Sequence, residues 1–295
     1  MSDPRVPCVW IVTTVFNRFD ALNRYLKCLE AQDYPNFKLI LVDHGTKDVA
    51  DHVQLPDYAH LIKASSDLWW TAAANVGHRY VLNEVNAADD DLIMLQNDDS
   101  TFDSTLISEL VRVSTQEDAV VGSVVVDRDT RKILHAHLTF NPKTATYRYP
   151  NKGEDVSVLG DRPLESDVLK GRGVVYPIGV VRNIGIMEER LVQYKSDHEW
   201  AHRAKRNGFR VLIAPKAVTE TVLDTQAKMD GASPLRSFWT LLFGRRSTRN
   251  LIYSFKYFYI GFPFFSATRY FLTDAVRMTV ITFLQMVKAL CRGRG

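Results

Sequence analysis

The first hundred residues alternate between short apolar runs and longer segments in which apolar residues recur at helical spacing. The apolar runs are rich in β-branched residues and lie at 9–16, 38–43, 59–65 and 91–96. The helical segments are 19–31 and 71–84. Continuously apolar strands separated by helices are typical of a parallel sheet that is covered on both faces. We therefore predict an α/β fold with a mostly parallel central sheet flanked by helices.

Polar residues stand at the point where each of these four strands ends. They are Thr13, Thr14 and Asn17, then Asp43, then Ser65, Ser66 and Asp67, and finally Asn97, Asp98 and Asp99. Open α/β sheets bind ligands in the crevice beyond the carboxyl ends of their parallel strands. Four polar strand ends along one edge therefore predict a ligand site. The two adjacent carboxylates of the last strand repel each other, so they need either open water or a cation.

The second half of the chain contains shorter strand-like segments. The pattern of 119–149 predicts strands that extend the sheet in antiparallel fashion, and 174–177 and 210–215 predict two more strands. Gly171 and Gly173, just before one of them, permit a close approach of the backbone to a neighbour. Further on, serine at position 196 and glutamate three residues later have the spacing of a capping box, which predicts a helix start.

The chain is charged unevenly. Residues 232–295 hold ten Lys and Arg but a single acid, Asp274, whereas the preceding residues hold 27 basic and 33 acidic side chains. The same segment carries 14 of the 32 aromatic residues. Its longest uncharged stretch, 257–268, is shorter than the ~20 residues of a membrane-spanning helix. We predict a helical region that binds an anionic membrane surface, with packing on the body or in a homodimer as the alternative.

Other sequence features narrow the class of protein. The three cysteines form no CxxC pair, and the N-terminal residues do not resemble a signal peptide, so we expect a cytoplasmic protein at the inner face of the membrane. Neither a GxGxxG nor a GxxxxGK[ST] motif occurs. Nucleic acid is not expected as a partner, because the body is acidic and the basic segment lacks a recognition motif.

Four stretches, taken in order, resemble the family 2 glycosyltransferases, which have a GT-A fold. They are the opening strand with the later YPNFKLILVDHGT, then SDLWWTAAANVG, LQNDD and KSDHEW. The likeness covers roughly residues 8–250, so 1–231 would be the catalytic domain and 232–295 the membrane-associating region. The QxxRW motif of processive synthases is absent. The chain thus resembles non-processive members of the bacterial rhamnosyltransferase and surface-polysaccharide type.

The resemblance implies a metal site at the end of the fourth strand. Asp99, helped by Asp98, would hold Mg²⁺ or Mn²⁺ against the diphosphate of a nucleotide sugar. The chain departs from the family pattern in two places. Asn97 replaces the first acid of the DxD motif, and 214–225 lacks the histidine that often serves as a third ligand. Glu220 is the candidate substitute.

The resemblance also implies substrate-binding and catalytic residues. The residues expected to bind substrate are Thr13, Thr14, Asn17, Asp43, Asp67, Trp70, Asn75, Asn97, Asp98 and Glu199. Asp197 of KSDHEW matches the general base, and its place at a helix start favours the ionised form. Glu199 has two other readings, since it can complete the capping box or pair with Arg203.

The implied activity is inverting transfer of one sugar from a UDP-, dTDP- or GDP-sugar to a hydroxyl of a lipid-linked or polysaccharide acceptor, in cell-surface glycan assembly. Two alternatives stay open. A nucleotidyltransferase could share the fold, although 13–20 lacks the glycine-rich basic loop that such an enzyme would need. A non-catalytic binder of sugar nucleotides is the other. Asp98, Asp99 and Asp197 argue against it, whereas Asn97 and the missing histidine keep it open.

Overall fold

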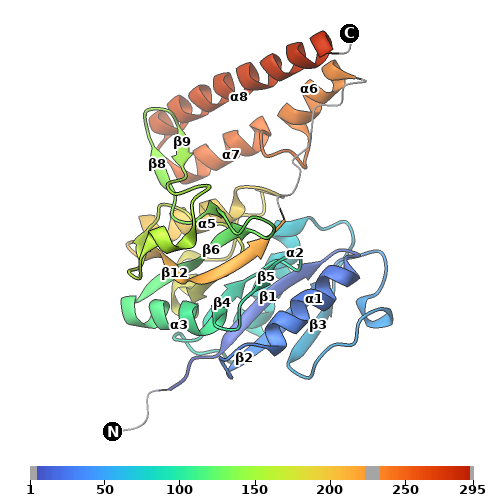
Figure 1. Ribbon diagram of the computed structural model, residues 1–295, viewed down its shortest axis with the longest axis vertical. Coiled ribbons are helices and arrows are strands. Elements are labelled where there is room, and N and C mark those ends of the chain that lie inside the picture. The colour runs from blue at the N-terminus through green and yellow to red at the C-terminus, as the bar shows by residue number, and fades with distance from the viewer. Residues whose placement is uncertain (1–4, 223–232, 293–295) are drawn as a thin grey trace.

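The computed structural model describes residues 5–222 and 233–292. Its centre is a ten-stranded sheet with the order β10-β12-β6-β11-β4-β1-β2-β3, in which β5 also pairs with β12 and β7 with β6 (Figure 1). The strands of this sheet are β1 (Val9–Val15), β2 (Phe37–Asp43), β3 (Ala59–Lys63), β4 (Leu92–Leu95), β5 (Thr101–Phe102), β6 (Ala119–Asp127), β7 (Ile133–His135), β10 (Leu164–Glu165), β11 (Val174–Pro177) and β12 (Arg210–Thr221).

Helices cover the sheet and form a separate unit beyond it. The helices of the body are α1 (Phe19–Glu30), α2 (Trp70–Asn83), α3 (Leu106–Glu117), α4 (Ile178–Ile184) and α5 (Ser196–Arg206). The helices of the C-terminal unit, residues 233–292, are α6 (Pro234–Phe243), α7 (Leu251–Gly261) and α8 (Phe264–Arg292). Figure 1 shows this unit standing beyond one end of the sheet, with α8 as its longest element.

The strand directions place the predicted polar ends together. β1 runs parallel to both β2 and β4, and β2 runs parallel to β3. The carboxyl ends of all four strands therefore lie on one edge, as predicted. β11 is antiparallel to both of its neighbours, β4 and β6, and β6 is parallel to β12. The prediction of a mostly parallel sheet flanked by helices is confirmed.

Two apolar clusters hold the helices on opposite faces of the sheet. Alternate residues of β1 show why, because successive strand side chains point to opposite faces. Ile11 packs in the cluster that contains the buried face of α1 and α3. Val12 packs in the cluster that contains α2, α4 and α5, including the fully buried Trp200. The first half of the chain therefore folds as its apolar pattern predicts.

A third apolar cluster joins the body to the C-terminal unit and corrects one prediction. β8 (Thr139–Asn141) and β9 (Thr146–Arg148) form a two-stranded hairpin of their own instead of extending the sheet. Phe140 of this hairpin lies 5.1 Å from the ring of Tyr270 and 5.2 Å from that of Phe262. Burial of these aromatic side chains against the C-terminal helices outweighs pairing with the main sheet. Of the predicted extensions, β7 alone joins that sheet among the described residues of 119–149 that follow β6.

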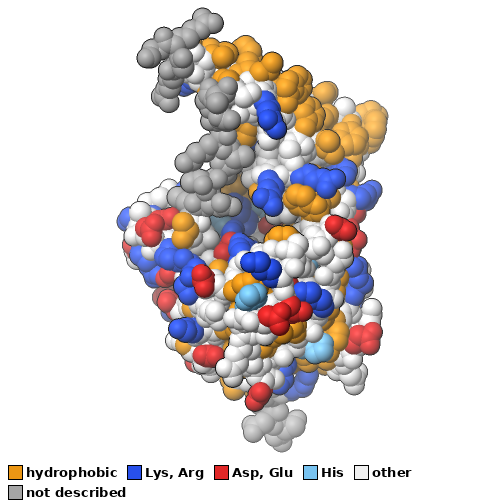
Figure 2. Space-filling model, turned by 90° about the vertical axis from the view of Figure 1, so that its right-hand side faces the viewer, with side chains coloured by type: hydrophobic (Ala, Val, Ile, Leu, Met, Phe, Trp, Pro, Cys, Tyr) orange, Lys and Arg blue, Asp and Glu red, His pale blue; other side chains and the backbone are white. Residues whose placement is uncertain are grey.

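The C-terminal unit exposes apolar side chains on its outer side. Nineteen large hydrophobic residues are exposed in the described parts of the chain, and 15 of them lie in this unit. Figure 2 shows hydrophobic side chains gathered over that end of the molecule, while the body shows mixed charge. Across residues 5–222 and 233–292, no helix combines the length and the apolar character needed to cross a membrane.

Candidate active site

The end of β2 braces the loop that follows it. Asp43 is fully buried, and its carboxylate accepts hydrogen bonds from the backbone N–H groups of Gly45 and Val49 at 2.9 and 3.0 Å. Lys63 at the end of β3 donates to the same carboxylate at 2.6 Å. Asn17, in a left-handed conformation with φ 54°, accepts from the N–H of Lys47 in this loop. These contacts fix the shape of the edge where β1, β2 and β3 end.

The acid pair at the end of β4 is bridged by an arginine. Asp98 is fully buried and Asp99 is partly buried. Arg18, which precedes α1, donates to one oxygen of each carboxylate, at 2.9 Å for Asp99 Oδ2. The guanidinium of Arg172 lies 3.8 Å from Asp99 Oδ1. Burial raises the pKa of the Asp98 carboxyl to about 7, although Arg18 acts in the opposite direction. The pair therefore lies in a setting that favours a positive partner.

The oxygens left over suit a hard cation. Asp98 Oδ2 and Asp99 Oδ1 are buried and accept no hydrogen bond from any described residue. Carboxylate oxygens are the ligands that Mg²⁺ and Mn²⁺ prefer, and Mg²⁺ keeps several waters and substrate oxygens in its shell. The candidate third ligand, Glu220, is engaged by Arg131 and by the Thr101 hydroxyl. In the described ranges no group of three His, Cys, Asp or Glu residues could hold a metal ion. Among the described residues, Asp98 and Asp99 are thus the two carboxylates that the geometry offers to a cation.

A tight loop before β11 runs between the acid pair and α5. Trp70 donates from its indole nitrogen to Asn97 Oδ1 at 3.2 Å. The ring of Trp70 lies so close to Gly171 that a Cβ there would be 2.9 Å from it. Gly173 has φ 64°, and a Cβ at this position would meet the Ser123 hydroxyl at 2.6 Å. The close approach expected at both glycines is confirmed.

The predicted base is held by the same loop. Asp197 lies in the first turn of α5, where its Oδ2 accepts the backbone N–H of Gly171 at 2.9 Å. Its Oδ1 accepts the N–H of His198 at 2.9 Å. Two backbone N–H donors, one from the loop and one from the helix itself, thus fix the orientation of this carboxylate. Burial lowers the pKa of the neighbouring Lys170 ammonium to about 8, while Asp197 acts to raise it.

The capping box predicted for this helix is wrong. The cap position belongs to Lys195, no side chain caps the helix, and Ser196 is the first helical residue. The hydroxyl of Ser196 instead hydrogen-bonds to that of Thr71 at 2.8 Å, inside the core. Because the serine begins the helix rather than precedes it, its side chain faces α2 and not its own first turn.

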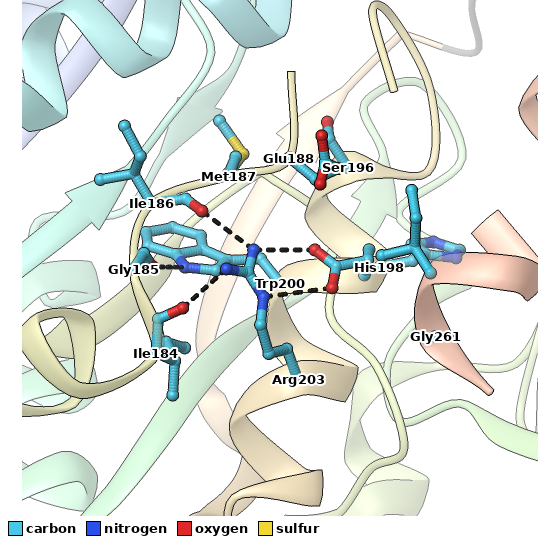
Figure 3. A network of polar contacts seen from close by, with 12 residues as sticks. Ile184, Gly185, Ile186, Met187, Glu188, Ser196, His198, Trp200, Arg203 and Gly261 are labelled. Atoms are coloured by element: carbon cyan, nitrogen blue, oxygen red, sulfur yellow. Dashed lines mark hydrogen bonds and ion pairs between the residues drawn. The ribbon is translucent and has the colours of Figure 1, made fainter. Parts of the chain in front are cut away.

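Glu199 takes the pairing that the sequence offered as an alternative. Its two oxygens accept from Arg203 at 3.1 and 2.8 Å, and Glu199 is buried. Arg203 also donates to the carbonyls of Ile184 and Ile186, and Trp200 donates to that of Gly185 (Figure 3). This network fastens the loop after α4 to α5. A contact of Glu199 with the acceptor stays a prediction, but both of its oxygens already have partners.

Four other residues were predicted to bind substrate, namely Thr13, Thr14, Asn75 and Asp67. The Thr13 hydroxyl is buried and bonds to that of Tyr25 at 2.7 Å, and Thr14 beside it is also buried. Asn75 is fully buried and donates to the carbonyl of Met187 at 2.8 Å. Asp67 is exposed in the turn before α2. The structure therefore brings Asn97, Asp98, Asp99, Trp70 and Asp197 around one loop, and places Asn75 in the packing behind it.

The arginines beside the acid pair were not predicted as residues of the site. Arg18 lies 80 residues from Asp98 in sequence, and Arg172 lies 73 residues from Asp99. Arg128 adds a third, since it donates to the backbone oxygen of Asp99 at 3.3 Å. One signal was available for Arg18, because it follows a predicted strand end directly and so must lie at the edge where the acids meet.

Comparison with known proteins identifies the family of the chain. A family model described as "Glycosyltransferase like family 2" matches residues 4–240. The chain belongs to this family. No curated protein matched the sequence.

Solved structures show the same fold at low sequence identity. GalNAc-T7 with UDP, GalNAc and Mn²⁺ superposes with a TM-score of 0.60 at 12% identity, over 92% of this chain and 55% of that one. The mannosyltransferase PcManGT from Pyrobaculum calidifontis, in complex with GDP-Man and Mn²⁺, gives 0.60 at 14% identity, over 98% and 75%. The chain thus spans about half the length of the first of these proteins. The predicted GT-A fold is confirmed.

Proposed function

We propose that this chain is an inverting, non-processive glycosyltransferase. It moves one sugar from a nucleoside diphosphate sugar to a hydroxyl of a lipid-linked or polysaccharide acceptor. The two structural neighbours were solved with UDP or GDP-Man and with Mn²⁺, which supports a nucleotide sugar as donor and a divalent cation as cofactor. The surface-polysaccharide role, including a rhamnosyltransferase identity, is the narrower form of the proposal.

The observation that carries the proposal is the loop before β11. Gly171 donates its N–H to Asp197, and the next residue, Arg172, faces Asp99 at 3.8 Å. Consecutive residues thus connect a carboxylate able to accept a proton with a carboxylate able to bind a cation. Transfer from a nucleotide sugar requires both functions, one on each side of the anomeric carbon.

Each residue of the site has a separate role in the proposed sugar transfer. Asp197 takes the proton of the acceptor hydroxyl as its oxygen attacks the anomeric carbon. The bond from that carbon to the diphosphate oxygen breaks, and the nucleoside diphosphate leaves with the electron pair. Arg18 and Arg172 lie where that negative charge gathers, and charge-assisted bonds from arginine to phosphate are strong. A divalent cation held by Asp98 and Asp99 would supply Lewis-acid stabilisation of the same diphosphate.

The exposed apolar face of the C-terminal unit supports action at a lipid surface. Phe264 and Phe265 at the start of α8 are 67% and 87% exposed, and the apolar residues continue along the helix. Arg269 and Lys288 are exposed on the same helix. Apolar side chains together with basic ones suit the interface of an anionic bilayer. A second copy of the chain is the other occupant that such a face could bind.

A binding screen tests the donor proposal. UDP, dTDP, GDP and their sugars are added with and without Mn²⁺ or Mg²⁺, and the melting temperature is followed, since a ligand that binds only the folded state raises it. We expect a metal-dependent increase with one nucleotide class, lost in Asp99→Ala. If no nucleotide stabilises the protein with either metal, the chain does not bind a nucleotide sugar and the proposal is wrong.

A further inference from the structure

The residue before α5 has an unusual backbone conformation. Lys195 has φ 72° and ψ −5°, in the left-handed region. A non-glycine residue is strained there and persists only when its surroundings hold it. The carbonyl of Lys195 accepts the N–H of Glu199 at 2.8 Å, which begins the helix. The conformation of this one residue therefore sets where Asp197, two positions later, points.

The side chain of Lys195 leaves the body and ends in the C-terminal unit. Its ammonium donates to the Ser254 hydroxyl on α7 at 3.3 Å and lies 3.9 Å from Asp274 Oδ2 on α8. It also lies over the rings of Tyr257 and Phe258, at 5.3 and 5.5 Å from their centroids. The lysine thus connects the predicted base to both long helices of the C-terminal unit.

The partner of Lys195 is itself exceptional. Asp274 is the only acid among residues 232–295, and its side chain is 3% exposed. Ser254 donates to Asp274 Oδ2, and Arg277 pairs with Oδ1. A buried carboxylate is destabilising unless it is paired, so a single buried acid in a basic segment indicates a specific partner. Burial lowers the pKa of the Lys195 ammonium, and Asp274 acts in the opposite direction.

Further contacts join the same two units beside this pair. Arg206 of α5 donates to the carbonyl of Gly261 at 2.6 Å, and His202 stacks on Phe262 with ring centroids 4.6 Å apart. The α5 helix is therefore packed between the body and the C-terminal unit. Its first turn, however, is connected to that unit through the side chain of Lys195.

We propose that Lys195 is a positioning residue for Asp197, and that Asp274 and Ser254 of the C-terminal helices anchor it. The C-terminal unit then contributes to catalysis by holding the base in place, in addition to any contact with a lipid surface. This inference rests on the proposed role of Asp197 as base. It predicts that loss of the anchor lowers turnover even with donors and acceptors free in solution.

The test compares four variants of the full chain with the wild type. Lys195→Ala removes the anchor, Lys195→Gly removes it but tolerates positive φ, and Asp274→Asn weakens the anchoring charge. Lys256→Ala is the matched control. Lys256 also crosses between the two units, with its ammonium 3.1 Å from the carbonyl of Arg190, but it does not touch the turn before α5.

Two readouts separate positioning from general stability. The first is hydrogen exchange of the backbone N–H groups of residues 171 and 196–200, which needs no ligand. The second is release of nucleoside diphosphate from the sugar donor found in the binding screen, measured alongside donor affinity. We expect Lys195→Ala and Asp274→Asn to speed exchange and lower kcat at least tenfold, with donor affinity within about twofold. Lys195→Gly recovers part of kcat, and Lys256→Ala matches the wild type.

Three results would overturn the inference. One is unchanged exchange and kcat in Lys195→Ala and Asp274→Asn while Asp197→Asn is inactive, which leaves the proposed function intact. Another is equal kcat in Lys195→Ala and Lys195→Gly, which would show that the turn conformation is not what the lysine maintains. The last is full activity of Asp197→Asn, which removes the base itself and with it the proposed function.

Discussion

The body and the C-terminal unit differ in how much apolar surface they leave exposed. In the body the core is apolar, and the buried acids Asp43 and Asp98 stand at one edge of the sheet. In the C-terminal unit Asp274 and Thr282 are buried, whereas Phe265 and Leu284 are 87% and 54% exposed. Folding in water favours the first arrangement. The second arrangement is what the proposed contact with a lipid surface, or with a second copy of the chain, would require.

The largest effect is expected at the base. Asp197→Asn keeps an oxygen to accept the N–H of Gly171 but cannot accept a proton, so kcat should fall by about 10³. Donor affinity and melting temperature should stay near those of the wild type. Release of nucleoside diphosphate at saturating donor measures kcat, and normal turnover would remove Asp197 as base.

A matched pair of leucine substitutions compares the buried core of the body with the exposed face of α8. Leu41 on β2 is fully buried, so Leu41→Ala should lower the free energy of unfolding by about 3 kcal/mol. Leu284→Ala on α8 should change it by less than about 0.5 kcal/mol, because that side chain is exposed. Urea unfolding without lipid measures both. Equal losses would show that the outer face of α8 is covered in solution, and light scattering would then test for a second copy.

Vesicle binding tests whether the exposed apolar side chains of α8 contact a membrane. The double change Phe264→Ser and Phe265→Ser should weaken sedimentation with phosphatidylglycerol-containing vesicles by at least about 100-fold, since burial of each side chain contributes about 1.5–3 kcal/mol. Val158→Ser is the control, because Val158 is also an exposed apolar residue, 51% exposed, but lies on the body. Undiminished binding of the double variant would place the membrane contact elsewhere, and binding by no variant would argue for a protein partner.

Near neutral pH, the smallest effect is expected from an acid sensitivity that arises in the body. Burial lowers the pKa of His78 to about 3, and residues 203–295 contain no histidine. The unfolded state therefore takes up a proton near pH 6.5 that the folded state refuses until about pH 3. The contribution of His78 to the free energy of unfolding is therefore fully present above pH 6.5. It falls by at most about 1.4 kcal/mol for each pH unit below that value. His78→Gln should flatten the dependence of the urea midpoint on pH, and an unchanged slope would exclude His78 as its source.

The sequence predicted what depends on local pattern. Continuous apolar runs fixed the parallel strands, and the polar residues after them marked the edge of the sheet where Asp43 and Asp98 lie. It failed where distant segments decide. The hairpin of β8 and β9 leaves the sheet because Phe140 packs on the C-terminal helices, and Ser196 is no cap because Thr71 binds its hydroxyl. Arg18 and Arg172 became part of the site only through the fold.

The length of α8 has a consequence for acceptor choice. Its 29 residues make a rod about 43 Å long, joined to the body through α7 and the β8–β9 hairpin. If that rod lies flat on a bilayer, Asp197 stands at a fixed height above the lipid. Only an acceptor hydroxyl that projects to that height from the membrane would then reach Asp197. Glycans would be selected by reach as well as by the identity of their terminal sugar.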